Sequence, residues 1–182
     1  ALVHEQGSVT PKFDATFGGS VNDAGQALLN GAVAAGFGTQ THVHGVGDGA
    51  FWIADQTNAK FGTQASYLAD FFFFFEYLSA ASKTCAPNAP HVWTESQKSL
   101  LKNNEFAVVI GNLTAYLEAD EIENDKAPVR ACHRYLSNRT DQLDYQGAIE
   151  KGLPIGSGEI ESAHRYVIQK RLKLPGAWWK AA

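Results

Sequence analysis

The amino-acid sequence predicts an α/β fold in which a sheet core carries a helical insertion. Strand and helix patterns alternate over residues 1–82, helical patterns fill 93–143, and a last helical pattern begins near 157. Such alternation is typical of a sheet with helices packed on its faces. With 182 residues, of which 45% are hydrophobic, the chain is long enough to bury a core. We expect a single domain over residues 1–182, with the helical insertion at about 84–150.

The first 70 residues are expected to alternate between strand and helix. Residues 1–5 suit a short strand, and the turn-rich segment after them has extended candidates around Val9 and Thr16. Residues 21–36 have helical spacing, and their expected buried face consists of Ala24, Leu28, Leu29 and Val33. Residues 41–47 alternate as a strand that Gly47-Asp48-Gly49 interrupts, residues 50–62 are a predicted helix, and residues 65–70 are a second strand.

Helices are expected over most of the remaining chain. Residues 71–82 begin with five phenylalanines, so this helix is apolar on every face and should be buried all round. The helical stretch from Trp93 to Leu143 should break near Gly111 and Pro128. The last helix should run from about residue 157 to 173, where Pro175 and Gly176 stop it.

Charge is unevenly distributed although the net charge is only −4. Five Lys and Arg residues and no acid follow Glu161, whereas residues 118–125 carry five acids and no base. The basic end suits a local nucleic-acid surface. It equally suits a solvated helix end whose cations complement the helix dipole. The charge pattern alone leaves both interpretations open.

Cysteine use and hydropathy indicate a protein of a reducing compartment. Cys85 and Cys132 form neither a disulfide framework nor a CxxC motif. The sequence shows no signal peptide and no run of 18 apolar residues, so we expect neither export nor membrane insertion and place the protein in the cytoplasm. The chain contains no Met and opens in the middle of a strand pattern, so we expect it to be a fragment.

Two carboxylates occupy positions that suit chemistry. Asp48 follows a strand and stands between glycines, which permit close approach of a ligand, although an ordinary Asp-Gly turn has the same pattern. Glu161 lies at the edge of the apolar stripe of the last helix, although it could simply pair with Arg165 one turn later. Glu159 is explained by the helix dipole. Carboxylates that converge from such elements hold Mg²⁺ and serve two-metal phosphoryl transfer.

Three segments resemble bacterial insertion-sequence DDE transposases of the Kra type, distant relatives of the Mutator-like group. "GLPIGSGEIESAHRYVIQKRLKLPGAWW" (152–179) is similar to their closing motif. "HGVGDGAFWI" (44–53) resembles the segment around their second catalytic Asp, and "YLADFFFFFEYL" (67–78) resembles their Asp-x-x-His segment. The resemblance spans roughly residues 1–180, and its most specific part is the Ile-Gly-Ser-Gly-x-x-Glu-Ser motif.

The resemblance implies an RNase H-like core with a helical insertion and Mg²⁺- or Mn²⁺-dependent DNA strand cleavage and transfer. It makes Asp48 the second acid and Glu161 the third, both catalytic and both metal ligands, with Asp70 in an auxiliary place. Its implied partners are DNA, as transposon ends and target, and further copies in a homo-oligomer at the nucleoid. The phosphate-contacting residues would be Arg165, Lys170, Arg171 and Lys173.

The sequence departs from the family pattern at two points. The first catalytic Asp is expected, with the first strand or strands, upstream of residue 1, since neither Asp14 nor Asp23 precedes a Gly within a strand. Phe73 stands where the family has His, which should leave Asp70 short of a partner. We therefore expect no strand-transfer activity from this chain.

Two alternatives to a transposase domain remain open. One is a decayed remnant that binds DNA without chemistry. The other is a metal-dependent hydrolase built on His42, His44 and Asp48, since two His residues two apart on a strand face one side.

Overall fold

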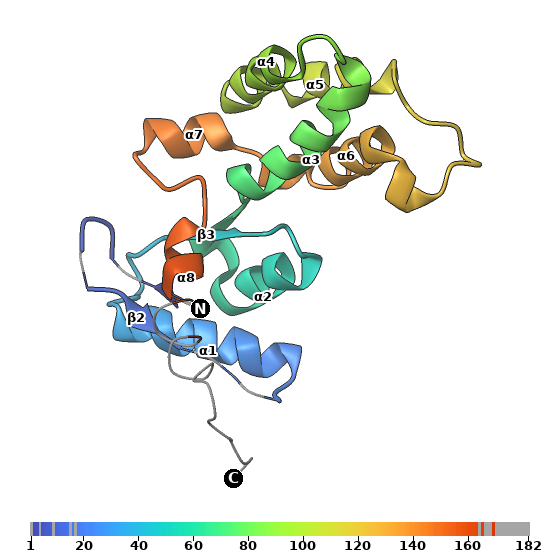
Figure 1. The fold of residues 1–182 in the computed structure, drawn as a ribbon. Coiled ribbons are helices and arrows are strands. Elements are labelled where there is room, and N and C mark those ends of the chain that lie inside the picture. Colours follow the sequence, from blue (N-terminus) through green and yellow to red (C-terminus); the bar gives the residue numbers. More distant parts are fainter. Residues whose placement is uncertain are drawn as a thin grey trace. The chain divides into compact units, whose positions relative to one another are not determined.

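The computed structural model describes residues 2–3, 5–8, 10–14, 16, 18–163, 165 and 169, without the side chains of residues 159, 161 and 163. The fold is mixed α/β and mostly helical, with short strands (Figure 1). It divides into two compact units. Unit 1 comprises Ala1–Val43, Asp55–Ala65 and Ser157–Ala182, and unit 2 comprises His44–Ala54 and Ser66–Gly156. None of the helices within the described ranges combines the length and the apolar content that a membrane span requires.

Unit 1 is built on a small antiparallel sheet. Strand β1 (Leu2–Val3) pairs with β2 (Lys12–Phe13), with Leu2 opposite Phe13. β1 falls within the strand expected at 1–5. β2 lies between the two extended segments expected next, and Val9 lies outside the described residues. Helix α1 (Val21–Ala34) contacts both strands, and α8 (Gly158–Ala163) contacts β1.

Helix α1 forms where the sequence predicts it, and the expected buried face is only partly right. Its buried residues are Gly25, Ala27, Gly31 and Ala32. Val33, which was expected inside, is 58% exposed. Small residues let neighbours approach closely: a Cβ on Gly25 would lie 2.0 Å from Oε1 of Gln56. Ala24, Leu28 and Leu29 of the expected face are half-buried, so the expectation is wrong only for Val33, and the fully buried positions are the small residues against which neighbours pack closely.

The second sheet consists of β3 (Val43–Gly47) and β4 (Ala65–Ala69), which confirms the strands expected at 41–47 and 65–70. His44 Nδ1 lies 3.2 Å from Ser66 Oγ, and Asp70 N donates to Gly47 O at 2.6 Å. Because the contacts advance together along both strands, the strands run in the same direction and their carboxyl ends share one edge. The crossover between them consists of α2 (Phe51–Phe61), a helix expected at 50–62, and the 3₁₀ turn η1 (Gly62–Gln64).

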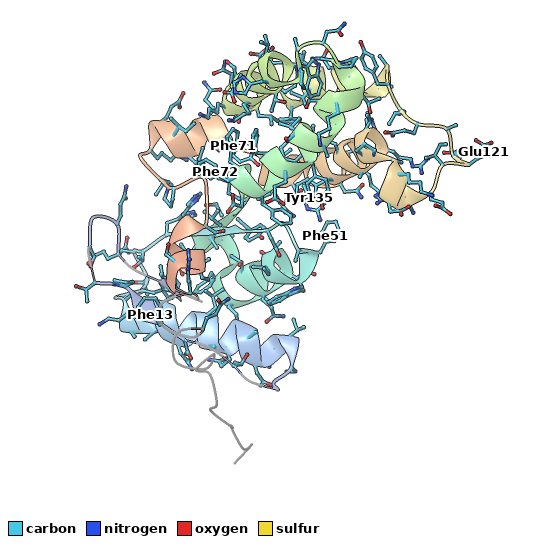
Figure 2. The ribbon with its side chains drawn as sticks, viewed as in Figure 1. Phe13, Phe51, Phe71, Phe72, Glu121 and Tyr135 are labelled. Carbon is cyan, nitrogen blue, oxygen red and sulfur yellow. The ribbon has the colours of Figure 1, made fainter. Side chains whose placement is uncertain are left out.

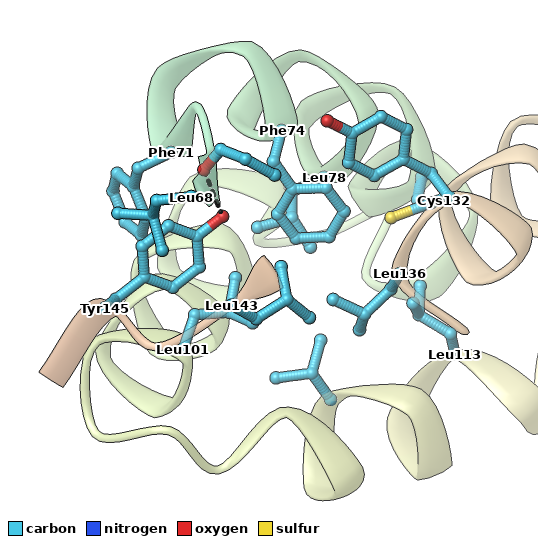
Figure 3. Packing of buried hydrophobic residues seen from close by; sticks show 14 of the residues in the cluster. Leu68, Phe71, Phe74, Leu78, Leu101, Leu113, Cys132, Leu136, Leu143 and Tyr145 are labelled. Atoms are coloured by element: carbon cyan, nitrogen blue, oxygen red, sulfur yellow. Dashed lines mark hydrogen bonds between the residues drawn. The ribbon is translucent and has the colours of Figure 1, made fainter. Parts of the chain in front are cut away.

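Five helices surround the main hydrophobic core of unit 2: α3 (Phe71–Cys85), α4 (Pro90–Lys102), α5 (Phe106–Thr114), α6 (Pro128–Ser137) and α7 (Tyr145–Glu150). The 3₁₀ turns η2 (Asn124–Lys126) and η3 (Thr140–Gln142) flank α6. Helix α3 packs against α4 and α6. Helices α4, α5 and α6 confirm that the stretch from Trp93 to Leu143 is largely helical, as expected. Figure 3 shows core side chains from these helices, including Phe74, Leu78, Leu101, Leu113, Cys132, Leu136 and Tyr145.

One expected helix break is confirmed and the other is wrong. Pro128 occupies the first turn of α6, where its missing N–H costs no hydrogen bond. Gly111 lies inside α5, and the break falls earlier, at Asn104, whose φ is +59°. An Asn adopts this left-handed conformation more readily than most residues, whereas an exposed Gly weakens a helix without ending it.

The five phenylalanines are not buried all round. Phe71 and Phe74 are 2% and 0% exposed, whereas Phe72 is 62% and Phe73 is 37% exposed. The run therefore obeys the helical period, with one face in the core and another at the surface. The Phe73 ring makes a T-shaped contact with Tyr77 and a tilted contact with Tyr135.

One residue of the acidic stretch at 118–125, Glu118, stabilises the start of α6. The carboxylate of Glu118 accepts hydrogen bonds from the backbone N–H groups of Val129 (2.9 Å) and Arg130 (2.7 Å) in the first turn of α6. Desolvation raises the pKa of Glu118, but the backbone hydrogen bonds, together with the positive charge of Arg130, outweigh it and hold the pKa below its ordinary value. The Arg130 side chain donates to the carbonyls of Glu118, Ala119 and Ile122.

Candidate functional site

Asp48 lies just beyond β3, at the edge where β3 and β4 both end. Its side chain is exposed, and its Oδ1 accepts a hydrogen bond of 2.9 Å from Ala50 N. No described residue donates to Oδ2. The short turn thus fixes the carboxylate through one oxygen and leaves the other available to a ligand. The carboxyl edge of a parallel sheet is where α/β proteins place their sites.

The main chain at Asp48 and Gly49 is held by three side chains from distant positions. Tyr135 Oη donates to Asp48 O at 2.9 Å, and Arg139 Nε donates to Gly49 O at 2.7 Å. Gly49 N in turn donates to Tyr67 Oη at 3.3 Å. Together these bonds connect the end of β3 to α6 and to β4, so the position of the Asp48 carboxylate depends on both elements.

Two further properties of this loop follow from its close packing. Gly49 has φ +79°, and a Cβ there would lie 2.4 Å from Tyr135 Oη and 2.6 Å from Arg139 Nε. Only glycine fits such a position. Burial raises the pKa of Tyr67 to about 12 and raises the pKa of Tyr135 above its ordinary value. Both hydroxyls therefore stay protonated at neutral pH.

Asp70, which follows β4 at the same edge, is the N-cap of α3. It is 4% exposed, and its Oδ1 accepts hydrogen bonds from Phe72 N (2.7 Å) and Phe73 N (3.1 Å). The expectation that Phe73 leaves Asp70 short of partners is wrong, because the backbone of the helix supplies them. A carboxylate that caps a helix in this way also complements its dipole.

The segment that precedes the Gly156-Ser157-Gly158 motif lies against β3 and the start of α3. Pro154 O contacts His44 Nε2 at 2.9 Å, and Ile155 O accepts from Phe71 N at 2.9 Å. A Cβ on Gly156 would lie 3.5 Å from Asp70 Oδ1. The chain is thus tied to the sheet immediately before it enters the motif.

The other predicted site residues are only partly within the described chain. Glu161 belongs to α8, but its side chain lies outside the described part. Arg165 is described and exposed, whereas Lys170, Arg171 and Lys173 lie outside the described residues. The pairing of Asp48 with Glu161 therefore stays a prediction.

The described residues contain no group of three or more His, Cys, Asp or Glu side chains that could hold a metal ion. The three residues of the hydrolase alternative, His42, His44 and Asp48, therefore do not form such a group. Both ring nitrogens of His44 already have neighbours, Ser66 Oγ and Pro154 O. Because a carbonyl only accepts, Nε2 carries a proton there and cannot ligate a metal.

Sequence reasoning missed Tyr135 and Arg139. They lie 87 and 90 positions after their partners at the end of β3, and no motif marks them. The only available signal was Gly49, since a glycine beside a candidate carboxylate indicates that something approaches closely. Asp23, which was weighed above as a first catalytic Asp and set aside, forms the N-terminal capping box of α1 with Ser20.

Comparisons with protein-family models, with curated protein sequences and with solved structures find no match to this chain. The resemblance to DDE transposases therefore depends on the sequence motifs alone.

Proposed function

We propose that the chain carries part of the catalytic domain of a DDE-type transposase, with an RNase H-like core and a helical insertion. Its chemistry would be Mg²⁺- or Mn²⁺-dependent cleavage and transfer of DNA strands. The observation that supports this most is the exposed Asp48 at the shared carboxyl edge of β3 and β4. The segment that leads into the Gly-Ser-Gly-x-x-Glu motif contacts β3 at His44 and the start of α3 at Phe71.

This edge of the sheet provides one of the carboxylates that a metal site of this kind needs. Asp48 offers an exposed carboxylate oxygen, which is the kind of ligand that Mg²⁺ prefers. Glu161 follows Gly156 by five residues, a stretch that spans at most about 18 Å when fully extended. We assign Asp48 and Glu161 as the metal ligands, and Asp70 as the residue that fixes the start of α3. A bound divalent ion would activate water or a 3′-hydroxyl and stabilise the leaving oxygen.

DNA is the proposed partner, and a homo-oligomer in the cytoplasm is the proposed form. The exposed Arg165 begins the basic series that continues with Lys170, Arg171 and Lys173. Such a series contacts phosphates and gives affinity that falls with salt, without reading sequence.

Iron-directed cleavage tests the metal site without requiring activity. Fe²⁺ with ascorbate and peroxide takes the place of Mg²⁺, and radicals formed at the bound iron cut the nearby backbone. Mass spectrometry should find cuts near residue 48 and also near residue 161. Excess Mn²⁺ should suppress both cuts, as should Asp48→Asn or Glu161→Gln.

The matched control is Glu121→Gln, an exposed acid of the 118–125 stretch (Figure 2), which should leave the cuts unchanged. Cuts near residue 48 without cuts near residue 161 would show that the two carboxylates do not share an ion. Cuts confined to 118–125 would assign metal binding to surface charge and refute the proposed site.

A further inference from the structure

We propose that Phe51, Trp52 and Arg139 form a platform that binds an unpaired nucleotide of single-stranded DNA beside Asp48. The inference rests on the proposed function for its choice of DNA as the ligand. The three residues belong to unit 2, as does Asp48. None of them is assigned a role by the sequence motifs.

Two large aromatic side chains are exposed on the helix turn that follows the candidate carboxylate in the sequence. Phe51 is 52% exposed and Trp52 is 45% exposed, and both lie in the first turn of α2, three and four positions after Asp48. Adjacent exposed aromatics at one site indicate an interaction surface more strongly than single exposed apolar residues do. Aromatic faces stack on nucleobases of any sequence.

Arg139 adds a fixed cation to this surface. Its Cζ lies 4.7 Å from the centroid of the Phe51 ring and 4.0 Å from that of Tyr135. Figure 2 labels Phe51, which belongs to α2, and Tyr135, which belongs to α6. Nε donates to Gly49 O and Nη1 donates to Tyr135 O at 3.1 Å, so the guanidinium is held in one orientation.

The remaining guanidinium nitrogen of Arg139 is Nη2. No described residue accepts a hydrogen bond from Nη2 of Arg139, although the side chain is half-buried. A guanidinium with a free donor edge suits a phosphate oxygen. Exposed aromatic faces and a free cationic donor together complement a base with its own phosphate.

An unpaired nucleotide fits this arrangement better than duplex DNA does. In a duplex each base face is covered by the neighbouring base pairs, so aromatic side chains reach it only after unstacking. A strand with an unpaired base presents both the π-face and the phosphate. The location beside Asp48 would place this nucleotide next to the proposed metal ligand.

Fluorescence anisotropy of a labelled twelve-nucleotide dT strand tests the proposal. Trp52→Ala and Phe51→Ala should each weaken binding at least fivefold, whereas Trp52→Phe should stay within twofold of the parent. Val92→Ala, which removes a 69% exposed apolar side chain from α4, is the matched control and should change nothing. Arg139→Gln should weaken binding and flatten its dependence on salt, after a denaturant melt has shown that the variant is folded.

A second strand separates stacking from phosphate contacts. The same length of DNA with abasic positions keeps every phosphate but offers no base to stack on. The parent should bind it at least fivefold more weakly, and Trp52→Ala should show a smaller difference between the two strands. Equal binding of both strands by the parent, or equal binding of dT by the parent and the alanine variants, would overturn the platform.

Other outcomes distinguish the platform from a protein interface and from the metal site. If the chain binds no single strand but self-associates, and Trp52→Ala abolishes the association, the surface is a protein interface and the proposal fails. Iron-directed cuts near residues 48 and 161 without base-dependent binding overturn the platform alone. Base-dependent binding without those cuts supports the platform and refutes the metal site.

Discussion

The hydroxyl of Tyr135 donates a 2.9 Å hydrogen bond to the main-chain carbonyl of Asp48. This bond joins α6, deep in the helical part of unit 2, to the loop that carries the proposed metal ligand. The Tyr135 ring is 6% exposed and stacks on Phe74 and Tyr77. The hydroxyl therefore has a fixed position, and the backbone of Asp48 is fixed with it.

Tyr135→Phe should lower the free energy of unfolding by about 1 kcal/mol, because the variant keeps the buried ring and loses one hydrogen bond. Urea denaturation followed by circular dichroism measures the change. Tyr116→Phe is the matched control, since Tyr116 is 46% exposed, and it should be neutral. Equal midpoints for both variants would show that the Asp48 carbonyl is satisfied by water when the hydroxyl is absent.

Two Gly→Ala substitutions should have opposite signs. Gly49→Ala should destabilise the chain by more than about 1 kcal/mol, because Gly49 has φ +79° and lies against Tyr135 and Arg139. Gly111→Ala should stabilise it by about 0.5–1 kcal/mol, because a Cβ there meets no heavy atom within 4 Å and alanine favours the helix. Thermal melts compare the two, and a stabilising Gly49→Ala would be incompatible with the loop geometry described above.

Glu118→Gln should make stability less sensitive to acid. The folded-state pKa of Glu118 lies below its ordinary value of 4.5, so the carboxylate stabilises the fold above that pH, and this stabilisation is lost as pH falls through the folded-state pKa. The expected difference is roughly 0.5–1 kcal/mol at pH 7, because the group is still partly hydrated. Denaturation at pH 7 and pH 3 measures it, with Glu121→Gln as the control. A difference that persists unchanged at pH 3 would indicate a steric cause.

Asp70→Ala should destabilise the chain by about 1–2 kcal/mol, because two backbone N–H groups at the start of α3 lose their acceptor. Asp70→Asn keeps an acceptor oxygen and should cost less. Phe73→His should not raise stability, since Asp70 already has its partners. A more stable Phe73→His variant in a denaturant melt would restore the idea that Asp70 needs a side-chain donor at this position.

The sequence predicted the strands and helices that have a clear hydrophobic period or that begin at a proline. Alternation around Val43 and Val46 predicted β3, and Pro128 marked the start of α6. The fully buried positions of α1 were missed because small residues such as Gly25 and Gly31 are invisible to a hydrophobic pattern. The break at Asn104 was missed because an Asn in the left-handed conformation is a weaker signal than a Gly.

Sequence reasoning could identify a site residue only where the neighbouring residues in the sequence mark it. Asp48 could be singled out because glycines flank it at the end of a strand. The capping role of Asp70 was not foreseen, because the family pattern directed attention to position 73 and away from the helix backbone. Tyr135 and Arg139 are brought to the loop by the packing of α3 against α6, a tertiary contact that sequence spacing does not encode.

The bond between Tyr135 and Asp48 spans 87 positions of the chain, which has a consequence for biosynthesis. At translation rates of roughly 5–20 residues per second, Tyr135 is added about 4–17 s after Asp48. The end of β3 therefore waits for seconds without the hydroxyl that holds it. Since closing a loop of this length costs conformational entropy before the contact is gained, the nascent chain should complete this edge of the sheet only after α6 has been synthesised and docked on α3.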